Sequence, residues 1–268
     1  MPRFCANISM LFAERPLLER PAAARAAGFM TIEVQFPYVV PLDDFARAVE
    51  AAGVEVALIN FPAGNAEKGD RGLGALPSRI AEFRDGVAEA KRYAARLGVK
   101  RFNLLAGVPG RDVPERDARA TLIENLSFAA EAVRDIGATV CLEAINTRDV
   151  PGFFLNDPDQ VVALIDEAGV RNAALQYDLY HMQIMCGDLI PTMERLLPRI
   201  GHMQFADTPG RHEPGTGEIN YANVFAAIDR IGYQGWLGAE YRPQGRTEDG
   251  LGWFAAWRAG AAGPRVPA

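Results

Sequence analysis

The chain has 268 residues, and its pattern predicts an eight-stranded (β/α)₈ barrel, the α/β class in which a ring of parallel strands is covered by helices. Eight short apolar runs alternate with longer, Ala-rich amphipathic runs, at about 33 residues per repeat. The apolar runs are continuous, as expected for parallel strands with helices on their outer side. A doubly wound open sheet would usually carry a Gly-rich turn after its first strand, and NISMLFAERP does not supply one. We therefore expect residues 1–268 to form a single TIM-barrel domain.

The elements follow in a regular order along the chain. Strands are expected, in order, at 4–8, 31–36, 54–60, 99–105, 138–143, 173–178, 200–206 and 235–240. Residues 79–97 and 121–136 repeat apolar side chains at steps of three or four, which predicts helices. Asp157 and Pro158 supply an N-cap and a first-turn proline for another helix, which Gly169 ends. Residues 61–76 contain four glycines and are either an active-site lid or a plain connector.

Composition excludes several classes of function. The 28 basic and 34 acidic residues give a net charge of −6. No block of basic residues stands out, which argues against a nucleic-acid partner. No apolar run reaches the ~18 residues that span a bilayer. The first residues do not resemble a secretory signal, so we expect a cytoplasmic protein with no membrane partner. Three scattered cysteines and three histidines favour neither a disulfide framework nor a metal cluster rich in imidazole.

Polar residues finish most of the predicted strands, where barrel enzymes carry their chemistry. These strand-end residues are Asn7, Glu33 or Gln35, Asn60, Asn103, Glu143, Asp178, Gln204 and Glu240. A single acid at such a position is as readily explained as a helix cap. Three carboxylates from the last four strands would repel one another unless a cation lay between them. An all-oxygen ligand set favours Mg²⁺, with Mn²⁺ as the alternative, over Zn²⁺.

Several segments carry a family resemblance. They are LEAINTRDVPGFFL (142–155), DLYH (178–181), HMQFADTPGRHEPGTGEINY (202–221) and GYQGWLGAEYRP followed by GLGWF (232–254). The chain resembles hydroxypyruvate isomerases, which belong to the xylose-isomerase-like barrels. The resemblance implies a metal held by Glu143, Asp178, Gln204 and Glu240, and proton transfer by Glu143 and Glu240. Sibling ketose epimerases usually carry His where Gln204 stands, which leaves the identity of the ion open.

The implied reaction interconverts hydroxypyruvate and tartronate semialdehyde by moving a proton between adjacent carbons through an enediolate. The substrate is thus a small hydroxy-oxo acid. We expect His181 to contact a substrate oxygen, with support of Asp178 as the alternative. Arg211 is the first candidate for binding the substrate carboxylate and Arg148 the second. Asn60 is expected to line the site.

Other functions remain as alternatives. The same site would suit isomerisation of a four-carbon oxo-acid, 2-oxo-tetronate, or 3-epimerisation of a ketose. A DNA-repair endonuclease of the same superfamily would need several His ligands and a basic surface, and a silent sugar-acid binding protein would not need Glu143 and Glu240. Trp253 and Trp257 suggest either helix packing or a face between subunits of a homo-oligomer, and we favour packing.

Overall fold

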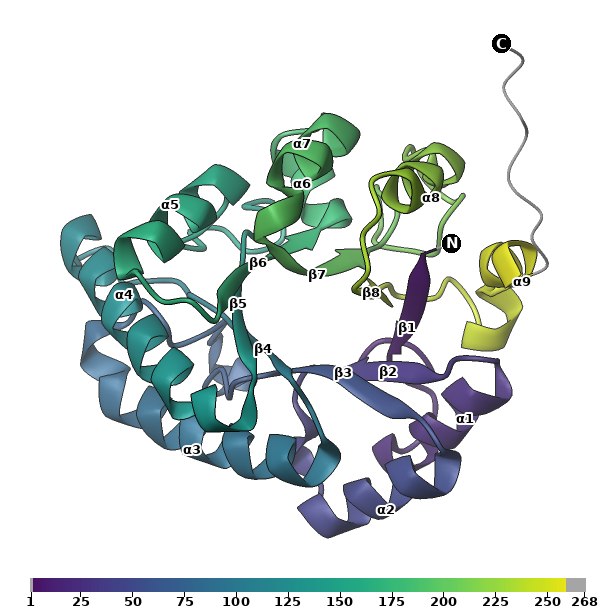
Figure 1. Ribbon diagram of the computed structural model, residues 1–268, viewed down its shortest axis with the longest axis horizontal. Coiled ribbons are helices and arrows are strands. Elements are labelled where there is room, and N and C mark those ends of the chain that lie inside the picture. The colour runs from purple at the N-terminus through teal and green to yellow at the C-terminus, as the bar shows by residue number, and fades with distance from the viewer. Residues whose placement is uncertain (1, 259–268) are drawn as a thin grey trace.

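The computed structural model describes residues 2–258. Eight parallel strands close into a barrel (Figure 1). Each strand pairs with its neighbours in sequence, and β1 pairs with β8. The strands are β1 Arg3–Asn7, β2 Thr31–Val34, β3 Glu55–Asn60, β4 Arg101–Leu104, β5 Thr139–Glu143, β6 Ala173–Asp178, β7 Ile200–Phe205 and β8 Trp236–Ala239. The predicted fold class is confirmed, and each strand overlaps the run that predicted it.

Helices surround the barrel (Figure 1). They are α1 Arg20–Ala26, α2 Leu42–Ala52, α3 Ile80–Leu97, α4 Glu115–Ala132, α5 Pro158–Ala168, α6 Leu179–Met185, α7 Leu189–Leu196, α8 Tyr221–Arg230 and α9 Gly252–Arg258. The side chain of Asp157 caps α5 as expected, accepting hydrogen bonds from two backbone amides, and Gly169 ends it in the left-handed conformation. The helix predicted at 121–136 differs: it begins after Pro114 and its last turn is a separate 3₁₀ turn, Arg134–Ile136.

The apolar core lies between the outer face of the sheet and the helices. Phe61, directly after β3, stacks on Phe102 of β4 with ring centroids 4.7 Å apart, and Phe83 of α3 meets it edge-on. At the end of the described chain, Trp253 and Trp257 of α9 both pack against Phe225 of α8. The two tryptophans therefore contribute to packing within the chain.

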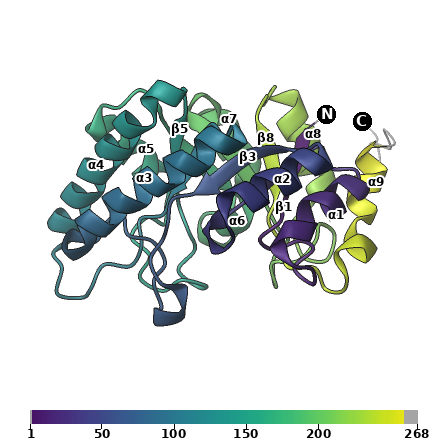
Figure 2. The same ribbon diagram turned by 90° about the horizontal axis from the view of Figure 1, so that it is seen from below.

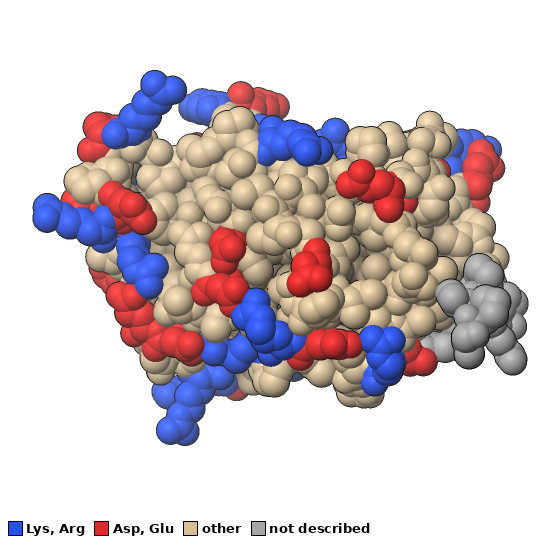
Figure 3. Space-filling model, turned by 90° about the horizontal axis from the view of Figure 1, so that it is seen from above, with Lys and Arg blue, Asp and Glu red and all other residues tan. Residues whose placement is uncertain are grey.

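The surface carries charges of both signs. On the face seen in Figure 3, basic and acidic side chains are interspersed among uncharged residues, and neither sign forms a continuous patch. Within residues 2–258, no helix is both long enough and apolar enough to cross a bilayer. The segment between β3 and α3 protrudes from the body of the barrel (Figure 2). It contains a short 3₁₀ helix, Ala66–Lys68.

Candidate active site

The polar strand-end residues surround one cavity. It has a volume of about 910 Å³ and takes its lining from the strand ends and from the segment after β3. Its walls include five residues expected at the site, namely Asn60, Glu143, His181, Arg211 and Glu240. Asp178 and Gln204 are each only 1% exposed and lie deeper. The barrel thus brings the predicted site residues to one end, with the exception of Arg148.

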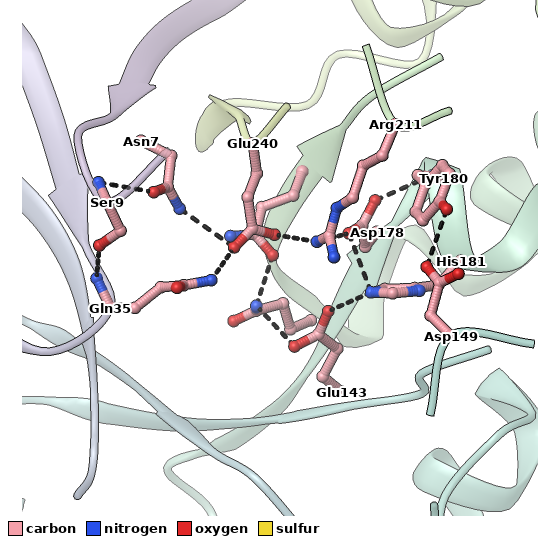
Figure 4. Close-up of polar contacts among 12 residues, drawn as sticks. Asn7, Ser9, Gln35, Glu143, Asp149, Asp178, Tyr180, His181, Arg211 and Glu240 are labelled. Atoms are coloured by element: carbon pink, nitrogen blue, oxygen red, sulfur yellow. Dashed lines mark hydrogen bonds and ion pairs between the residues drawn. The ribbon is translucent and has the colours of Figure 1, made fainter. Parts of the chain in front are cut away.

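Glu143, Asp178 and His181 form a compact group of potential ligands. Each offers one ligand atom, and these atoms all lie within 4.8 Å of one another. His181 Nε2 is 3.5 Å from Asp178 Oδ2 and 3.7 Å from Glu143 Oε1 (Figure 4). Asp178 Oδ2 is buried and has no hydrogen-bond partner in the described part of the chain. A buried carboxylate oxygen without a hydrogen bond is costly unless a cation approaches it.

Arg211 lies between Glu240 and Asp178. Its Nη2 atom is 3.0 Å from Glu240 Oε2 and 3.6 Å from Asp178 Oδ2 (Figure 4). When all three carboxylates are ionised, they and the one guanidinium leave an excess of two negative charges, because burial lowers the pKa of His181 well below its usual range and keeps it neutral. One divalent cation would balance this excess, so the residues present fit such an ion.

The pKa values of the three acids reflect the same crowding. Burial raises the pKa of Glu240 to about 8, although Arg211 opposes the rise. It likewise raises the pKa of Asp178 to about 6. Burial, with the charges of Glu240 and Asp178, raises the pKa of Glu143 well above its usual range. A bound cation would favour the ionised forms and lower all three pKa values.

Gln204 links two glutamates through hydrogen bonds. Its Oε1 accepts from Gln176 Nε2 at 2.6 Å, and the same Gln176 amide donates to Glu143 Oε2 at 3.2 Å. Its Nε2 donates to Glu33 Oε1 at 2.8 Å. Asn7 then joins Glu33 to Glu240, donating to both at 2.9 and 3.1 Å. Asn103 completes the network by donating to Glu143 Oε2 at 2.7 Å.

A second polar layer lies beneath this network, around Glu33. His202 Nε2 is 2.6 Å from Glu33 Oε2, and Cys5 Sγ is 3.5 Å from the same oxygen. Burial alone would raise the pKa of Glu33, but His202 and the hydrogen bonds from Gln204 and Asn7 lower it overall. Each oxygen of this carboxylate already has two partners, which gives the cluster a structural role.

The loop after β7 holds Arg211 in place. Asp207 is fully buried, and its carboxylate accepts hydrogen bonds from the backbone amides of Thr208, Gly215, Gly217 and Ile219 at 2.9 to 3.0 Å. A Cβ at Gly217 would lie 2.2 Å from the Thr208 carbonyl oxygen. The HEPGTGEI segment therefore wraps around one carboxylate, and Arg211 adopts a left-handed conformation with φ of 59° within this loop.

A third group of residues fixes the ring of His181. The Asn146 backbone N–H donates to Nδ1 at 3.3 Å, and the Asn146 side-chain nitrogen is 2.7 Å from the same atom. Nδ1 is thus an acceptor, which leaves the proton of the neutral ring on Nε2, facing the carboxylates. Asp149 in turn accepts from the Asn146 amide and from the Tyr180 hydroxyl, at 3.1 and 2.8 Å.

Other predicted residues lie at the margin or outside the site. Asn60 is 3% exposed and lines the cavity, where its carbonyl accepts a hydrogen bond from Tyr38 at 2.6 Å. Arg148 is exposed and does not line the cavity. The segment 61–76 does line it and is fastened to the barrel: Gly74 N–H donates to the Leu105 carbonyl at 3.1 Å. Whether this segment moves as a lid stays an open expectation.

Sequence reasoning missed the supporting residues Gln176, Asn146 and Asp149. A signal for the first was present, because Gln176 stands two before Asp178 on β6, as His202 stands two before Gln204 on β7. Side chains two apart on a strand share a face, so the inward faces of β6 and β7 carry two polar layers. The other two lie in a loop, and no periodic pattern places them near His181.

Comparison with known proteins agrees with this architecture. Residues 21–257 match the family model described as xylose isomerase-like TIM barrel, and the chain belongs to that family. Within it, the chain is 45% identical to 2-oxo-tetronate isomerase of Cupriavidus necator over 95% of this chain and 98% of that protein. It is 44% identical to hydroxypyruvate isomerase of Escherichia coli, over 96% and 100%. The resemblance seen in the sequence is confirmed, and the chain is an enzyme of the isomerase class.

Solved structures show the same fold. The crystal structure of a protein named AP endonuclease, family 2, from Brucella melitensis superimposes with a TM-score of 0.93 at 40% identity, covering 96% of this chain and 99% of that one. The structure of 3-keto-D-glucoside 4-epimerase from E. coli has a TM-score of 0.80 at 18% identity, over 96% and 100%. At that identity the likeness concerns the fold alone.

Proposed function

We propose that the enzyme interconverts hydroxypyruvate and tartronate semialdehyde. The observation that carries this proposal is that two buried glutamates, Glu143 and Glu240, line one cavity beside Asp178, whose buried Oδ2 has no hydrogen-bond partner among residues 2–258. Isomerisation of an α-hydroxy carbonyl compound needs two proton-transfer groups and a means of stabilising a developing oxyanion. The names of the relatives at 44–45% identity support this reaction class.

Glu143, Asp178, Gln204 and Glu240 are the residues we assign to hold a divalent metal, Mg²⁺ first and Mn²⁺ second. Such an ion would supply positive charge to the substrate oxygens on which negative charge develops. For Gln204 to serve, its Oε1 would exchange the hydrogen bond from Gln176 for the ion. The excess of two negative charges around Arg211 supports a divalent rather than a monovalent ion.

The two glutamates differ in how firmly they are held, and this suggests their roles. Both hydrogen bonds that Glu143 accepts, from Asn103 and Gln176, go to Oε2. Its Oε1 is therefore free to take a proton from C3 of hydroxypyruvate. Glu240 is bonded on both oxygens, by Asn7 and Gln35 on Oε1 and by Arg211 on Oε2. We assign it to deliver a proton to C2 of the enediolate, while the hydroxyl proton passes from O3 to O2.

His181 lies beside Glu143 and Asp178, and its Nε2–H faces both carboxylates. In this position it can donate a hydrogen bond to a substrate oxygen as charge builds on that oxygen. Because burial keeps the ring neutral, it would stabilise the oxyanion by hydrogen bonding rather than by adding a positive charge.

The test uses the variants Glu143→Gln and Glu240→Gln in D₂O, followed by NMR. We expect both to lose turnover while keeping the fold. Glu143→Gln should also lose exchange of the C3 proton of hydroxypyruvate, whereas Glu240→Gln should retain it. The matched control is Glu218→Gln, an exposed residue that does not line the cavity. Normal turnover in either site variant would refute its assigned role. Chelation should lower the activity and the melting temperature, and added Mg²⁺ or Mn²⁺ should restore both.

Isomerisation of 2-oxo-tetronate is the second candidate, because the relative from C. necator carries that name. A ketose 3-epimerase is a weaker alternative, since the neighbours with such names are at most 23% identical to this chain. A panel of three-, four- and six-carbon substrates chooses among the three, and turnover of a neutral ketohexose alone would refute the acid-substrate proposal. Cleavage of abasic-site DNA would instead favour the activity for which the B. melitensis protein is named.

A further inference from the structure

The cavity contains more positive charge than the proton-transfer site uses. Three arginines line it: Arg71 in the segment after β3, Arg211 in the loop after β7 and Arg242 three residues after β8. The side chain of Arg211 is 17% exposed and lies within 3.0 Å of Glu240 and 3.6 Å of Asp178, so its charge is already shared between two carboxylates. Arg71 and Arg242 are exposed and stand nearer to solvent.

Arg71 has no acidic partner in the described part of the chain. Its Nη1 donates only to two backbone carbonyls of its own loop, those of Asp70 at 2.7 Å and Ala66 at 3.3 Å. Its neighbour Asp70 forms a salt bridge with Arg79 instead, at 2.7 Å. The guanidinium thus keeps a full, uncompensated charge beside the cavity.

The loop holds Arg71 at a defined place. Asp70 accepts a hydrogen bond from the Asn65 backbone at 2.6 Å, and Gly72 N–H donates to the Ala63 carbonyl at 3.2 Å. A Cβ at Gly72 would lie 2.5 Å from the Leu105 carbonyl oxygen, so the backbone there packs directly against the segment after β4. Anchors on both sides of Arg71 limit the entropy that would be lost when it binds a ligand.

Arg242 is likewise held through its backbone, with its side chain free. Its N–H donates to the Arg211 carbonyl at 2.7 Å, and its own carbonyl is 2.7 Å from His212 Nδ1. Within residues 2–258, no ion pair or side-chain hydrogen bond holds its guanidinium. It follows Glu240 by two residues, so it lies close to one of the two proton-transfer groups.

We propose that Arg71 and Arg242 bind the carboxylate of the substrate and set a preference for hydroxy-oxo acids over neutral ketoses. This inference rests on the proposed function. The reacting carbons must lie beside Glu143 and Glu240, and Arg211 already contacts two carboxylates, so the substrate carboxylate extends toward the rim. Arginine suits that role because its guanidinium can bind a carboxylate through two parallel hydrogen bonds.

The test compares a substrate that carries the carboxylate with a neutral analogue that lacks it. Dihydroxyacetone has the reacting carbons of hydroxypyruvate but a hydroxymethyl group in place of the carboxylate. In Arg71→Gln and Arg242→Gln we expect kcat/KM for hydroxypyruvate to fall about 10- to 100-fold, mainly because KM rises. This is the range expected when a hydrogen bond to a charged group is lost. Proton exchange of dihydroxyacetone should change less than about twofold, since it lacks the group bound.

Matched controls come from the same chain. Arg148→Gln removes an exposed arginine outside the cavity and should leave both substrates unchanged. Glu67→Gln removes an acid that lines the cavity on the same loop as Arg71, and it should lower KM for the acid or leave it unchanged. Equal losses on both substrates in the arginine variants, or no loss on either, would overturn the proposal.

Calorimetric titration separates this inference from the proposed function. Glycerate is an unreactive three-carbon acid, and glycerol is its neutral counterpart. The wild type should bind glycerate more tightly than glycerol, and both arginine variants should lose that difference, whichever substrate the enzyme turns over. If the wild type turns over only a four-carbon oxo-acid, the proposed function fails and the arginine assignment stands. If glycerate and glycerol bind alike, the arginine assignment fails even where hydroxypyruvate is a substrate.

Discussion

Gly238 on β8 tests whether the lower polar layer positions the site. A Cβ built there would lie 2.4 Å from Glu33 Oε1 and 2.5 Å from Oε2. Ordinary contact begins near 3.4 Å, so in Gly238→Ala the carboxylate would have to move by about 1 Å in a densely packed interior. It is held in place by Asn7, Gln204 and His202 at 2.9, 2.8 and 2.6 Å.

The expected cost follows from those contacts. A movement of this size would break at least two hydrogen bonds to a buried, ionised carboxylate, each worth about 1.5–3 kcal/mol. The substitution should therefore lower the free energy of unfolding by roughly 3–6 kcal/mol and the melting temperature by on the order of 10 °C. Because Gln204 and Asn7 lose their common partner, kcat should fall as well.

Urea denaturation and thermal melts measure the loss of stability. The control is Gly245→Ala, because a Cβ at Gly245 would have no heavy atom within 4 Å. That substitution should lower the free energy of unfolding by less than ~0.5 kcal/mol. A double-mutant cycle with Glu33→Ala isolates the cause. In that background the added methyl group displaces nothing, so Gly238→Ala should cost under ~1 kcal/mol more. Additive costs would show that the clash with Glu33 is not the source of the destabilisation.

Three further substitutions test the supports of the site. Gly217→Ala would place a Cβ 2.6 Å from Asp207 Oδ1 and so displace the loop that carries Arg211. We expect kcat/KM to fall more than tenfold. A wild-type kcat/KM would refute the claim that this loop positions Arg211 in the site. Asn146→Ala removes a hydrogen-bond partner of His181 Nδ1. It should lower the free energy of unfolding in urea titrations by about 1 kcal/mol, and it should lower kcat rather than raise KM. An unchanged kcat would contradict the role given to Asn146. Asp70→Asn breaks the half-buried salt bridge with Arg79, a pair worth under ~1 kcal/mol, so the melting temperature should change very little. KM for the acid should rise, because the loop that carries Arg71 loses one of its anchors.

The fold was predictable because it depends on local patterns. Continuous apolar runs, apolar side chains repeated at steps of three or four, and caps such as Asp157 indicate elements that need no knowledge of distant contacts. The difference at 121–136, like those at several strand ends, concerned where an element begins and ends and not its existence. The ends of this helix depend on Pro114 and on a 3₁₀ turn after Ala132, features that a run of apolar residues does not reveal.

Only the acidic residues at the strand ends of the site were predictable from the sequence. Glu143 and Asp178 end strands and Glu240 follows one directly, so barrel topology alone places them together. The residues that hold them come from elsewhere: Asn146 lies in a loop, and Gln176 looks like an ordinary strand residue. Their role depends on which side chains face each other across β5, β6 and β7, and a sequence states that only after the register is known.

Arg211 shows most clearly why the net charge of the buried site could not be predicted from the sequence. It stands seven residues after Gln204 in a loop rich in glycine and proline, where an exposed position is the usual expectation. Asp207 gathers four backbone amides and draws that loop onto the barrel mouth, which buries the guanidinium between Glu240 and Asp178. The same arginine that seemed free to bind substrate is therefore needed to offset one of three buried acids. We therefore assign recognition of the substrate's charge to arginines that no carboxylate engages in the described part of the chain, Arg71 and Arg242.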